Sequence, residues 1–290
     1  MSQINVNVVA PLGYTGVEVG NNDYVQLFDG SGVCVFKSST AGNSVKAGGS
    51  NPTADIVTGV YIGRFAGSQM QYIGTGADVA VGIGALQNSQ WASANVAIGS
   101  YALQSNTGTG TFGIYNTAVG TMSGQNITDG SNNTIIGNFS ASSLTTGNNN
   151  IVIGSTASTA TATSSNSVTL GNASITSLRC AVTSITSLSD ARDKKEVEDL
   201  NVGLDFIDGL RPVKFVWDDR DEAGKHDIAD FGFIAQELKA AEDAVEMADV
   251  LKLVYDENPE KLEATYGKLI PILVKAVQEL SAEVKALKSK

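Results

Sequence analysis

The most regular feature of the chain is an apolar triplet followed by glycine, which recurs between residues 60 and 171 and usually follows an asparagine. One example is the stretch Asn95-Val96-Ala97-Ile98-Gly99. The last glycines of these units are Gly82, Gly99, Gly120, Gly137, Gly154 and Gly171. Four of the five intervals between them are 17 residues, and the fifth is 21. A fixed period of this kind predicts a solenoid.

Each repeat offers one short strand rich in β-branched residues, a tight glycine turn and a small residue three positions after the glycine. Stacked coils would pair these strands in parallel and align the asparagines into a hydrogen-bonded ladder. A coil of about 17 residues encloses little apolar interior, so we expect several chains to bundle around one axis. A single-chain β-helix without a partner is the alternative.

The segments on either side of the repeats also show strand patterns. Residues 4–9, 17–25 and 33–36 predict short strands in a small N-terminal β module, which either attaches the chain to another protein or caps the repeats. Residues 172–188 alternate apolar and polar positions, as a half-buried strand does.

Beyond residue 195 the spacing of apolar residues changes to three and four, which predicts a helix over residues 197–210. A strand over 213–217 follows, then an acidic loop that holds the only histidine, His226. This histidine could assist proton transfer, but we interpret it as a solvated loop residue. Another helix is expected from about Phe233 through Ala244.

The final helix has a heptad pattern. Its apolar residues are spaced 3, 4, 3, 4 and 3 apart, and they are Ile270, Leu273, Val277, Leu280, Val284 and Leu287. One chain cannot bury such a seam, so the pattern predicts parallel partner helices. Pro271 would lie in the first turn, where proline is tolerated.

Charge divides the chain near residue 188. Residues 1–188 carry a net charge of −2 and residues 189–290 a net charge of −9. We therefore expect four parts: a β module (1–55), a repeat solenoid (56–171), a β stalk (172–188) and an α-rich domain with a short C-terminal coiled coil (189–290). The predicted fold class is mainly β, a trimeric parallel β-solenoid followed by an α+β domain.

The composition excludes several functions. No segment has the length and hydropathy of a membrane span, and the first residues lack the features of a signal peptide. The acidic balance without a basic patch argues against a nucleic-acid partner. Cys34 and Cys180 match no metal or redox spacing, so we assign them no role and expect neither a metal nor a cofactor.

Ser189 and Lys194, at the junction near residue 188, form a possible catalytic dyad. A serine hydroxyl needs a base to become a nucleophile, and a lysine whose pKa is lowered by burial can be that base. Residues five apart share neither a helix face nor a strand face, so a turn or a second copy of the chain must bring them together. The alternative is an exposed linker in which Ser189 caps a helix.

The region from residue 189 onward resembles the peptidase S74 family of intramolecular chaperones, found at the C-termini of bacteriophage tail fibres and tailspikes. The resemblance rests on Ser189-Asp190-Ala191-Arg192 with Lys194, on residues 210–217, on Gly232 through Glu237 and on the last helix. It implies that Ser189 is the nucleophile and Lys194 the base, with cleavage between Leu188 and Ser189. Asp190, Arg192, Gly232 and Gln236 would support the motif. Asp193 stands where the family usually has an apolar residue, and it could tether Lys194 as a charged ammonium.

The repeats resemble the head repeats of trimeric autotransporter adhesins, which form a trimeric left-handed β-roll. Together the resemblances imply a homotrimeric bacteriophage tail fibre, part of the virion and made in the host cytoplasm, with an autoproteolytic chaperone. Its other partners would be the baseplate or another tail protein and a polysaccharide or protein receptor on the host surface. It would act on no external substrate.

Three alternatives remain. A bacterial adhesin-like surface protein should carry a signal peptide and a membrane anchor. A tailspike depolymerase needs a pair of carboxylates, whereas residues 60–188 contain only Asp78 and Asp129. A membrane-tethered transcription regulator with the same protease would need a DNA-binding region.

Overall fold

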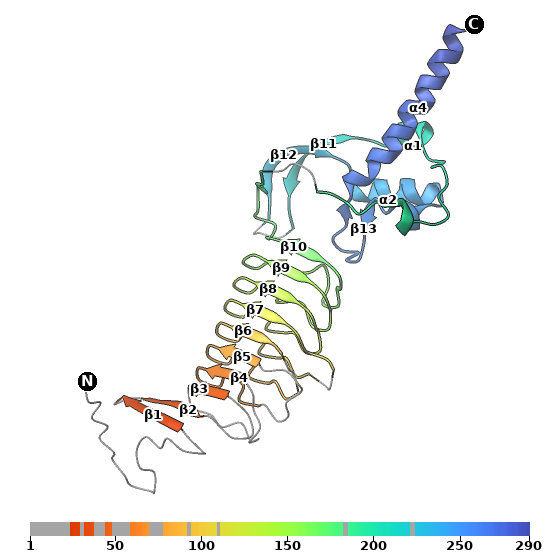
Figure 1. Cartoon of the computed structure of the whole chain (residues 1–290). Coiled ribbons are helices and arrows are strands. Elements are labelled where there is room, and N and C mark those ends of the chain that lie inside the picture. Colours follow the sequence, from red (N-terminus) through yellow and green to blue (C-terminus); the bar gives the residue numbers. More distant parts are fainter. Residues whose placement is uncertain are drawn as a thin grey trace. The chain divides into compact units, whose positions relative to one another are not determined.

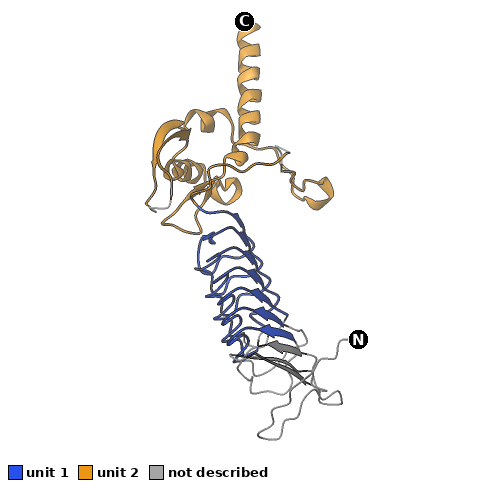
Figure 2. Ribbon diagram, turned by 90° about the vertical axis from the view of Figure 1, so that its left-hand side faces the viewer, with its two compact units in different colours: residues 1–172 blue, residues 173–290 orange. Residues whose placement is uncertain are grey.

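The structure of the protein is a computed structural model of the 290-residue chain. It describes residues 59–69, 78–91, 94–108, 111–181, 185–220 and 224–290, together with the backbone of three strands nearer the N-terminus. The chain divides into two compact units, residues 1–172 and residues 173–290 (Figure 2).

The first unit contains a parallel sheet in which each strand pairs with the strand of the next coil (Figure 1). Its strands are β3 (Ser44–Ala47), β4 (Gly59–Ile62), β5 (Asp78–Val81), β6 (Val96–Ile98), β7 (Thr117–Val119), β8 (Thr134–Ile136), β9 (Ile151–Ile153) and β10 (Val168–Leu170). The coils between them make a solenoid of about six turns. The predicted parallel β-solenoid is therefore confirmed, and its sheet extends back to β3, before the first recognisable repeat.

Upstream of the solenoid, β1 (Tyr24–Asp29) and β2 (Gly32–Lys37) pair in antiparallel fashion. β2 covers the strand expected at residues 33–36. The strand expected at 4–9 and most of the one expected at 17–25 lie outside the described residues.

The interior of the solenoid is filled by the middle residue of each strand. Ala97, Ala118, Ile135 and Val152 occupy this position, are fully buried and are in register with one another. The small residues three positions after the glycines also point inward, and Ala85, Ala102 and Ala157 are fully buried. Large side chains on the far side of the coil complete the core; they are Leu86, Leu103, Ile127 and Leu144.

The repeated glycine is required by close backbone approach. Gly137 has φ +138°, and a Cβ at this position would lie 2.3 Å from the carbonyl oxygen of Gly154 in the next coil. No side chain fits in that space, so this coil can stack on the next only with glycine at position 137.

The predicted asparagine ladder is present. The backbone amide of Asn116 donates to Oδ1 of Asn95 (2.8 Å), that of Asn133 to Asn116 (3.0 Å) and that of Asn150 to Asn133 (3.0 Å). The side-chain amides donate across the coil, as from Asn133 Nδ2 to the carbonyl oxygen of Gly147 (2.9 Å). Since these asparagines are almost completely buried, the ladder satisfies polar groups that would otherwise destabilise the interior.

The second unit contains short elements around a small core. The strands are β11 (Val213–Asp218), β12 (His226–Gly232), β13 (Val254–Tyr255) and β14 (Glu263–Ala264). The helices are α1 (Leu204–Asp208), α2 (Ala235–Ala244), α3 (Ala248–Leu251) and α4 (Leu269–Lys288), with 3₁₀ turns η1 (Ala191–Asp193) and η2 (Tyr266–Lys268). β11 pairs with β12, and β13 with β14, both in antiparallel fashion.

Three local predictions for this unit are wrong. The helix expected over 197–210 spans only α1, because Glu196 has φ +54° and Gly203 precedes the helix with a non-helical backbone. The loop expected around His226 is strand β12, which forms by pairing with β11. Residues 173–181 and 185–190 contain no strand, and none of the described residues covers the apolar side chains of Ile185 and Leu188, which are almost fully exposed.

Helix α4 has two faces with different surroundings. Leu269, Ile272 and Ala276 are buried, and the first two pack with Val202 and Phe206 in the core. The predicted heptad seam lies on exposed surface; the exposed fractions run from 40% for Val284 to 69% for Leu287. As predicted, Pro271 is in the first turn of the helix. None of the described helices is both long enough and apolar enough to cross a membrane.

Candidate functional site

The residues that precede the candidate dyad are exposed and irregular. Leu188 is fully exposed, and no helix or strand is formed from residue 185 until η1 begins at Ala191. The peptide bond between Leu188 and Ser189 is therefore accessible, as a bond to be cut must be.

A single 3₁₀ turn follows, and Asp190 holds it in place. Its Oδ1 accepts a hydrogen bond from the backbone N–H of Arg192 at 2.9 Å, so Asp190 is the N-cap of η1. The Arg192 guanidinium also binds both carboxylate oxygens, with its closest contact at 2.6 Å to Oδ2. These bonds from Arg192 lower the pKa of Asp190, which keeps the carboxylate charged and able to cap the turn.

The turn brings the two residues of the predicted dyad together. Lys194 Nζ lies 2.6 Å from Ser189 Oγ and 3.0 Å from the carbonyl oxygen of Ser189. The chain reverses within η1, where the backbone N–H of Lys194 donates to the carbonyl oxygen of Ala191 at 3.2 Å. The separation of five residues is thus bridged within one chain.

In chemical terms the arrangement joins a nucleophile to a base. An unprotonated Lys194 amine could accept the proton of the Ser189 hydroxyl, which is within hydrogen-bonding distance. The side chains of Ser189 and Lys194 are exposed in the single chain. The single chain therefore does not provide the burial that was expected around the Lys194 amine.

Ser187 is a polar contact that the sequence reasoning missed. Its hydroxyl lies 3.5 Å from the carbonyl oxygen of Leu188, a long contact with the oxygen that would become negative during attack on this carbonyl. The sequence offered one indication of this contact, because the Ser187 hydroxyl belongs to the residue just before Leu188.

Asp193 does not form the predicted tether. Among the described residues it makes no ion pair with Lys194, and its backbone N–H donates to the carbonyl oxygen of Asp190 at 3.2 Å. The Asp193 side chain is exposed, so the neighbouring Lys194 remains available to Ser189.

Residues 189–250 match the Peptidase_S74 family, described as chaperone of endosialidase. The S74 match begins at the candidate nucleophile and covers both members of the dyad. The helix α4 and its seam lie beyond it. Comparisons with curated proteins and with solved structures gave no match.

The motif from Gly232 through Glu237 has a structural basis in Gly232, at the end of β12. A Cβ on this buried glycine would lie 2.5 Å from the Tyr266 hydroxyl, and that hydroxyl accepts a hydrogen bond from the backbone N–H of Phe233 at 3.3 Å. Gly232 therefore allows η2 to approach the hairpin. Gln236 lies four residues on, exposed on α2.

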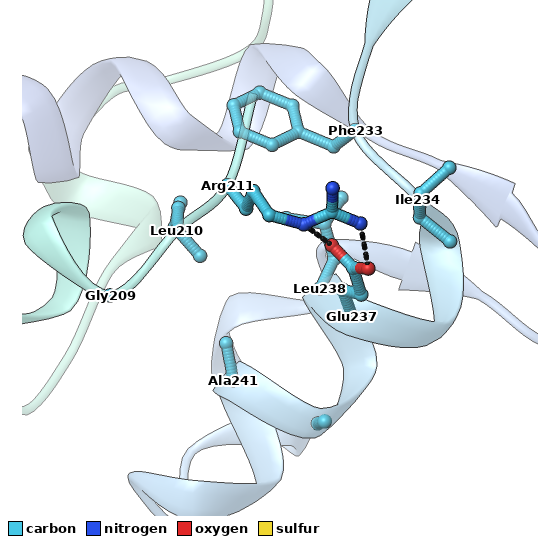
Figure 3. Close-up of a pocket in the computed structure, with 9 residues that line it drawn as sticks. Gly209, Leu210, Arg211, Phe233, Ile234, Glu237, Leu238 and Ala241 are labelled. Carbon is cyan, nitrogen blue, oxygen red and sulfur yellow. Dashed lines mark hydrogen bonds and ion pairs between the residues drawn. The ribbon is translucent and has the colours of Figure 1, made fainter. Parts of the chain in front are cut away.

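The S74 region also contains a pocket of about 370 Å³ between the end of α1 and helix α2 (Figure 3). Arg211 and Glu237 lie in it, joined by two hydrogen bonds, one of them 3.1 Å long from Nε to Oε2. The pocket walls include Phe233 and Ile234, but neither Ser189 nor Lys194, so the pocket is separate from the dyad.

The histidine and the two cysteines of the chain are not part of the dyad. His226 Nδ1 is 3.4 Å from Asp218 Oδ1 across the β11–β12 hairpin, and Cys180 is exposed. The side chain of Cys34 lies outside the described residues. Among the described residues, no three His, Cys, Asp or Glu side chains gather as a metal site would require.

Proposed function

We propose that this protein is a homotrimeric bacteriophage tail fibre whose C-terminal unit is an intramolecular chaperone. That unit would gather three copies, hold their solenoids in register and then release them by cutting between Leu188 and Ser189. The observation that carries this proposal is the 2.6 Å contact between Lys194 Nζ and Ser189 Oγ at the start of the S74 match.

The solenoid explains why a chaperone would be needed. Its sheet consists of parallel strands that pair only across neighbouring coils, typically 17 residues apart, and such non-local pairing forms slowly and exposes strand edges meanwhile. A helix seam that associates first would set the register before the coils wind. The exposed heptad positions of α4 are suited to that task.

The proposed cut is an acyl transfer followed by hydrolysis. Lys194 takes the proton of the Ser189 hydroxyl, and Oγ attacks the carbonyl carbon of Leu188. The bond from Leu188 to the Ser189 nitrogen breaks as that nitrogen takes up a proton, which leaves an ester between Leu188 and Ser189 Oγ. Water then hydrolyses the ester to a Leu188 carboxylate and the Ser189 hydroxyl.

Assembly would control the timing of the cut. The dyad is exposed in the single chain, and a base that must be unprotonated gains from being shielded from water. Neighbouring copies in a trimer would provide that shielding. After the chaperone is released, the fibre would persist because the barrier to its unfolding is high.

Mass measurement of purified protein tests the proposal. Wild-type protein should give two chains that meet at the bond between Leu188 and Ser189, whereas Ser189→Ala should remain at 30.1 kDa. Ser142→Ala changes an exposed serine in the solenoid and should be cut as the wild type is. Wild-type protein that assembles and still remains intact would disprove the self-cleavage.

A further inference from the structure

The 21-residue coil of the solenoid, longer than the coils that follow it, carries an insertion at one point. The backbone N–H of Gly108 donates to the carbonyl oxygen of Thr128 at 3.4 Å, and that of Gly113 donates to the next carbonyl oxygen, that of Asp129, at 2.9 Å. Two consecutive residues of one coil are thus paired with residues five apart in the other. The four additional residues are therefore 109–112, of which Thr111 and Phe112 are described and exposed.

Three large aromatic side chains are exposed at and beside this insertion. Phe112, its last residue, has an exposed fraction of 54%, and Tyr115 has 57%. Trp91, with 40%, is on the preceding coil beside the start of the insertion, since the backbone N–H of the adjacent Gln90 donates to the carbonyl oxygen of Thr107 at 3.4 Å. Aromatic residues gathered on a surface are typical of binding sites.

Tyr115 departs from the repeat at a position that favours asparagine. The equivalent residues of the next three coils are Asn132, Asn149 and Asn166, all with a left-handed backbone and φ between 56° and 60°. Tyr115 has the same conformation, with φ +59°, which suits a bulky side chain less well than asparagine. More than half of the Tyr115 side chain is exposed, so little burial offsets this cost. Stability therefore does not explain the tyrosine, whereas a role in binding does.

The surroundings of the aromatic residues are polar and almost uncharged. Asn132 is exposed beside Tyr115, since its backbone N–H donates to the carbonyl oxygen of Ile114 at 3.0 Å. Its side-chain amide can both donate and accept hydrogen bonds. Residues 82–128 contain no charged side chain, and the next residue is Asp129. A ligand at this site therefore needs no charge, and Asp129 would repel an anionic one.

This combination of groups fits a neutral saccharide. The carbon-bound hydrogens on one face of a sugar ring pack against aromatic rings, while the sugar hydroxyls need amide or carboxylate partners. An interface with a folded protein requires about 800 Å² on each side, more than three partly exposed rings supply. An anionic lipid surface would be bound by basic residues, and residues 82–128 contain none.

We infer that Trp91, Phe112 and Tyr115 form a binding site for a neutral saccharide, with Asn132 as a hydrogen-bonding neighbour. The inference rests on the proposed fibre function and adds the place of the receptor site and the chemical class of the receptor. All four residues belong to neighbouring coils of one chain, so the site is complete without another copy.

Tryptophan fluorescence of the full-length Ser189→Ala protein tests the site. The probes are hexasaccharides of glucose, galactose, mannose and N-acetylglucosamine, each titrated separately. At least one of them should change the emission in a saturable manner. The change should be absent in Trp91→Phe, because the other tryptophan, Trp217, belongs to the second unit. If none of the four probes changes the emission or gives a binding heat in calorimetry, the inference is wrong.

Two substitutions test the other rings with the probe that binds. Tyr115→Asn and Phe112→Ser should each raise the dissociation constant about tenfold, and Tyr115→Asn introduces the residue that the next three coils already carry. Phe139→Asn is the matched control, since Phe139 is also an exposed aromatic residue with a positive φ, and it should bind as the wild type does. Unchanged binding by Tyr115→Asn and Phe112→Ser, or an equal loss in Phe139→Asn, would overturn the inference.

Light scattering on the same variants separates this inference from the proposed function. If Tyr115→Asn or Phe112→Ser converts a trimer into a monomer, the rings hold copies together and the saccharide site is disproved. If the wild-type protein is itself a monomer, the proposed fibre is disproved. A monomer that binds a probe through Trp91 would still have the saccharide site, because the site belongs to one chain.

Discussion

The backbone N–H of Asn95 donates a hydrogen bond to Oδ1 of Asp78 at 2.7 Å, which places an aspartate at the first position of a ladder otherwise built by asparagines. Asp78 is fully buried, and its Oδ2 has no hydrogen-bond partner among the described residues. Asparagine at the same place would present an amide donor instead of a second acceptor. The ladder therefore ends on a buried carboxylate oxygen that is not paired with a described residue. Protonation of Asp78 would remove the negative charge from this buried group.

The stability of the solenoid should fall as pH rises from about 4 to about 7. Burial raises the pKa of Asp78 to about 7, against the opposing effect of the hydrogen bonds from Asn95. Between its unfolded pKa of about 4 and this value the folded chain binds a proton that the unfolded chain does not, so the free energy of unfolding decreases with pH, by up to about 4 kcal/mol. The neighbouring Tyr61 hydroxyl stays neutral throughout this range because burial and Asp78 raise its pKa.

Asp78→Asn should remove this dependence and stabilise the protein above pH 7. Denaturant unfolding of the Ser189→Ala chain at pH 5 and pH 8 measures both effects. Asp199→Asn replaces an exposed aspartate and should leave the pH profile unchanged. Equal pH profiles for wild type and Asp78→Asn would contradict the prediction.

Asn133→Ala should destabilise the solenoid strongly. The substitution removes the acceptor of the Asn150 backbone N–H and the donor to the carbonyl oxygen of Gly147. Each buried polar group left unpaired costs about 1–3 kcal/mol, so we expect a loss of about 3 kcal/mol in the free energy of unfolding. Asn126→Ala, which truncates an exposed asparagine, should cost less than about 1 kcal/mol. Similar unfolding midpoints for the two variants would argue against the ladder as a major source of stability.

Lys194→Arg should abolish the cut, because a guanidinium does not give up its proton and cannot act as the base. Lys195→Arg, one residue further on, should cut normally, since Lys195 Nζ is directed to Glu196 at 3.8 Å. The fraction of cut chain against time, followed on denaturing gels, measures both. If the Lys194→Arg protein is still cut, Lys194 is not the base.

Asp190→Ala should slow the cut about five- to tenfold. An N-cap is worth about 1 kcal/mol, and its loss lets the turn that holds Lys194 beside Ser189 open. Asp190→Asn keeps a cap and should recover most of the rate, while Asp193→Ala should have no effect. If Asp190→Asn is as slow as Asp190→Ala while both remain trimeric, Asp190 acts through its charge and not as the cap.

The double variant Val277→Asp, Leu280→Asp should prevent assembly, because it places two carboxylates in the exposed apolar seam of α4. Light scattering should give a monomer for this variant and a trimer for wild type. Ala282→Asp adds charge to α4 at an exposed position outside the seam and should assemble normally. A trimer that survives the double substitution would mean that the seam does not hold the copies together.

The sequence by itself determined the solenoid. The 17-residue period, the glycines and the asparagines were sufficient because every coil repeats the same local geometry, so the interaction between neighbouring coils follows from the pattern. The inward position of Ala97 and its equivalents and the ladder through Asn133 are direct consequences of that repetition. The apolar seam of α4 was predicted for the same reason, since a heptad is also a repeat.

Only the tertiary structure decided the C-terminal unit. Residues 197–203 have helical spacing but are not helical, because Val202 packs into the core from irregular chain and Glu279 accepts the first N–H of α1 at 2.7 Å. Strand β12 depends on its pairing with β11, and no local sequence pattern predicts this pairing. The contact between Ser189 and Lys194 likewise depends on a turn capped by Asp190, whereas their spacing alone placed them apart. In each case the interaction that determines the structure joins residues that are not related by a repeat in the sequence.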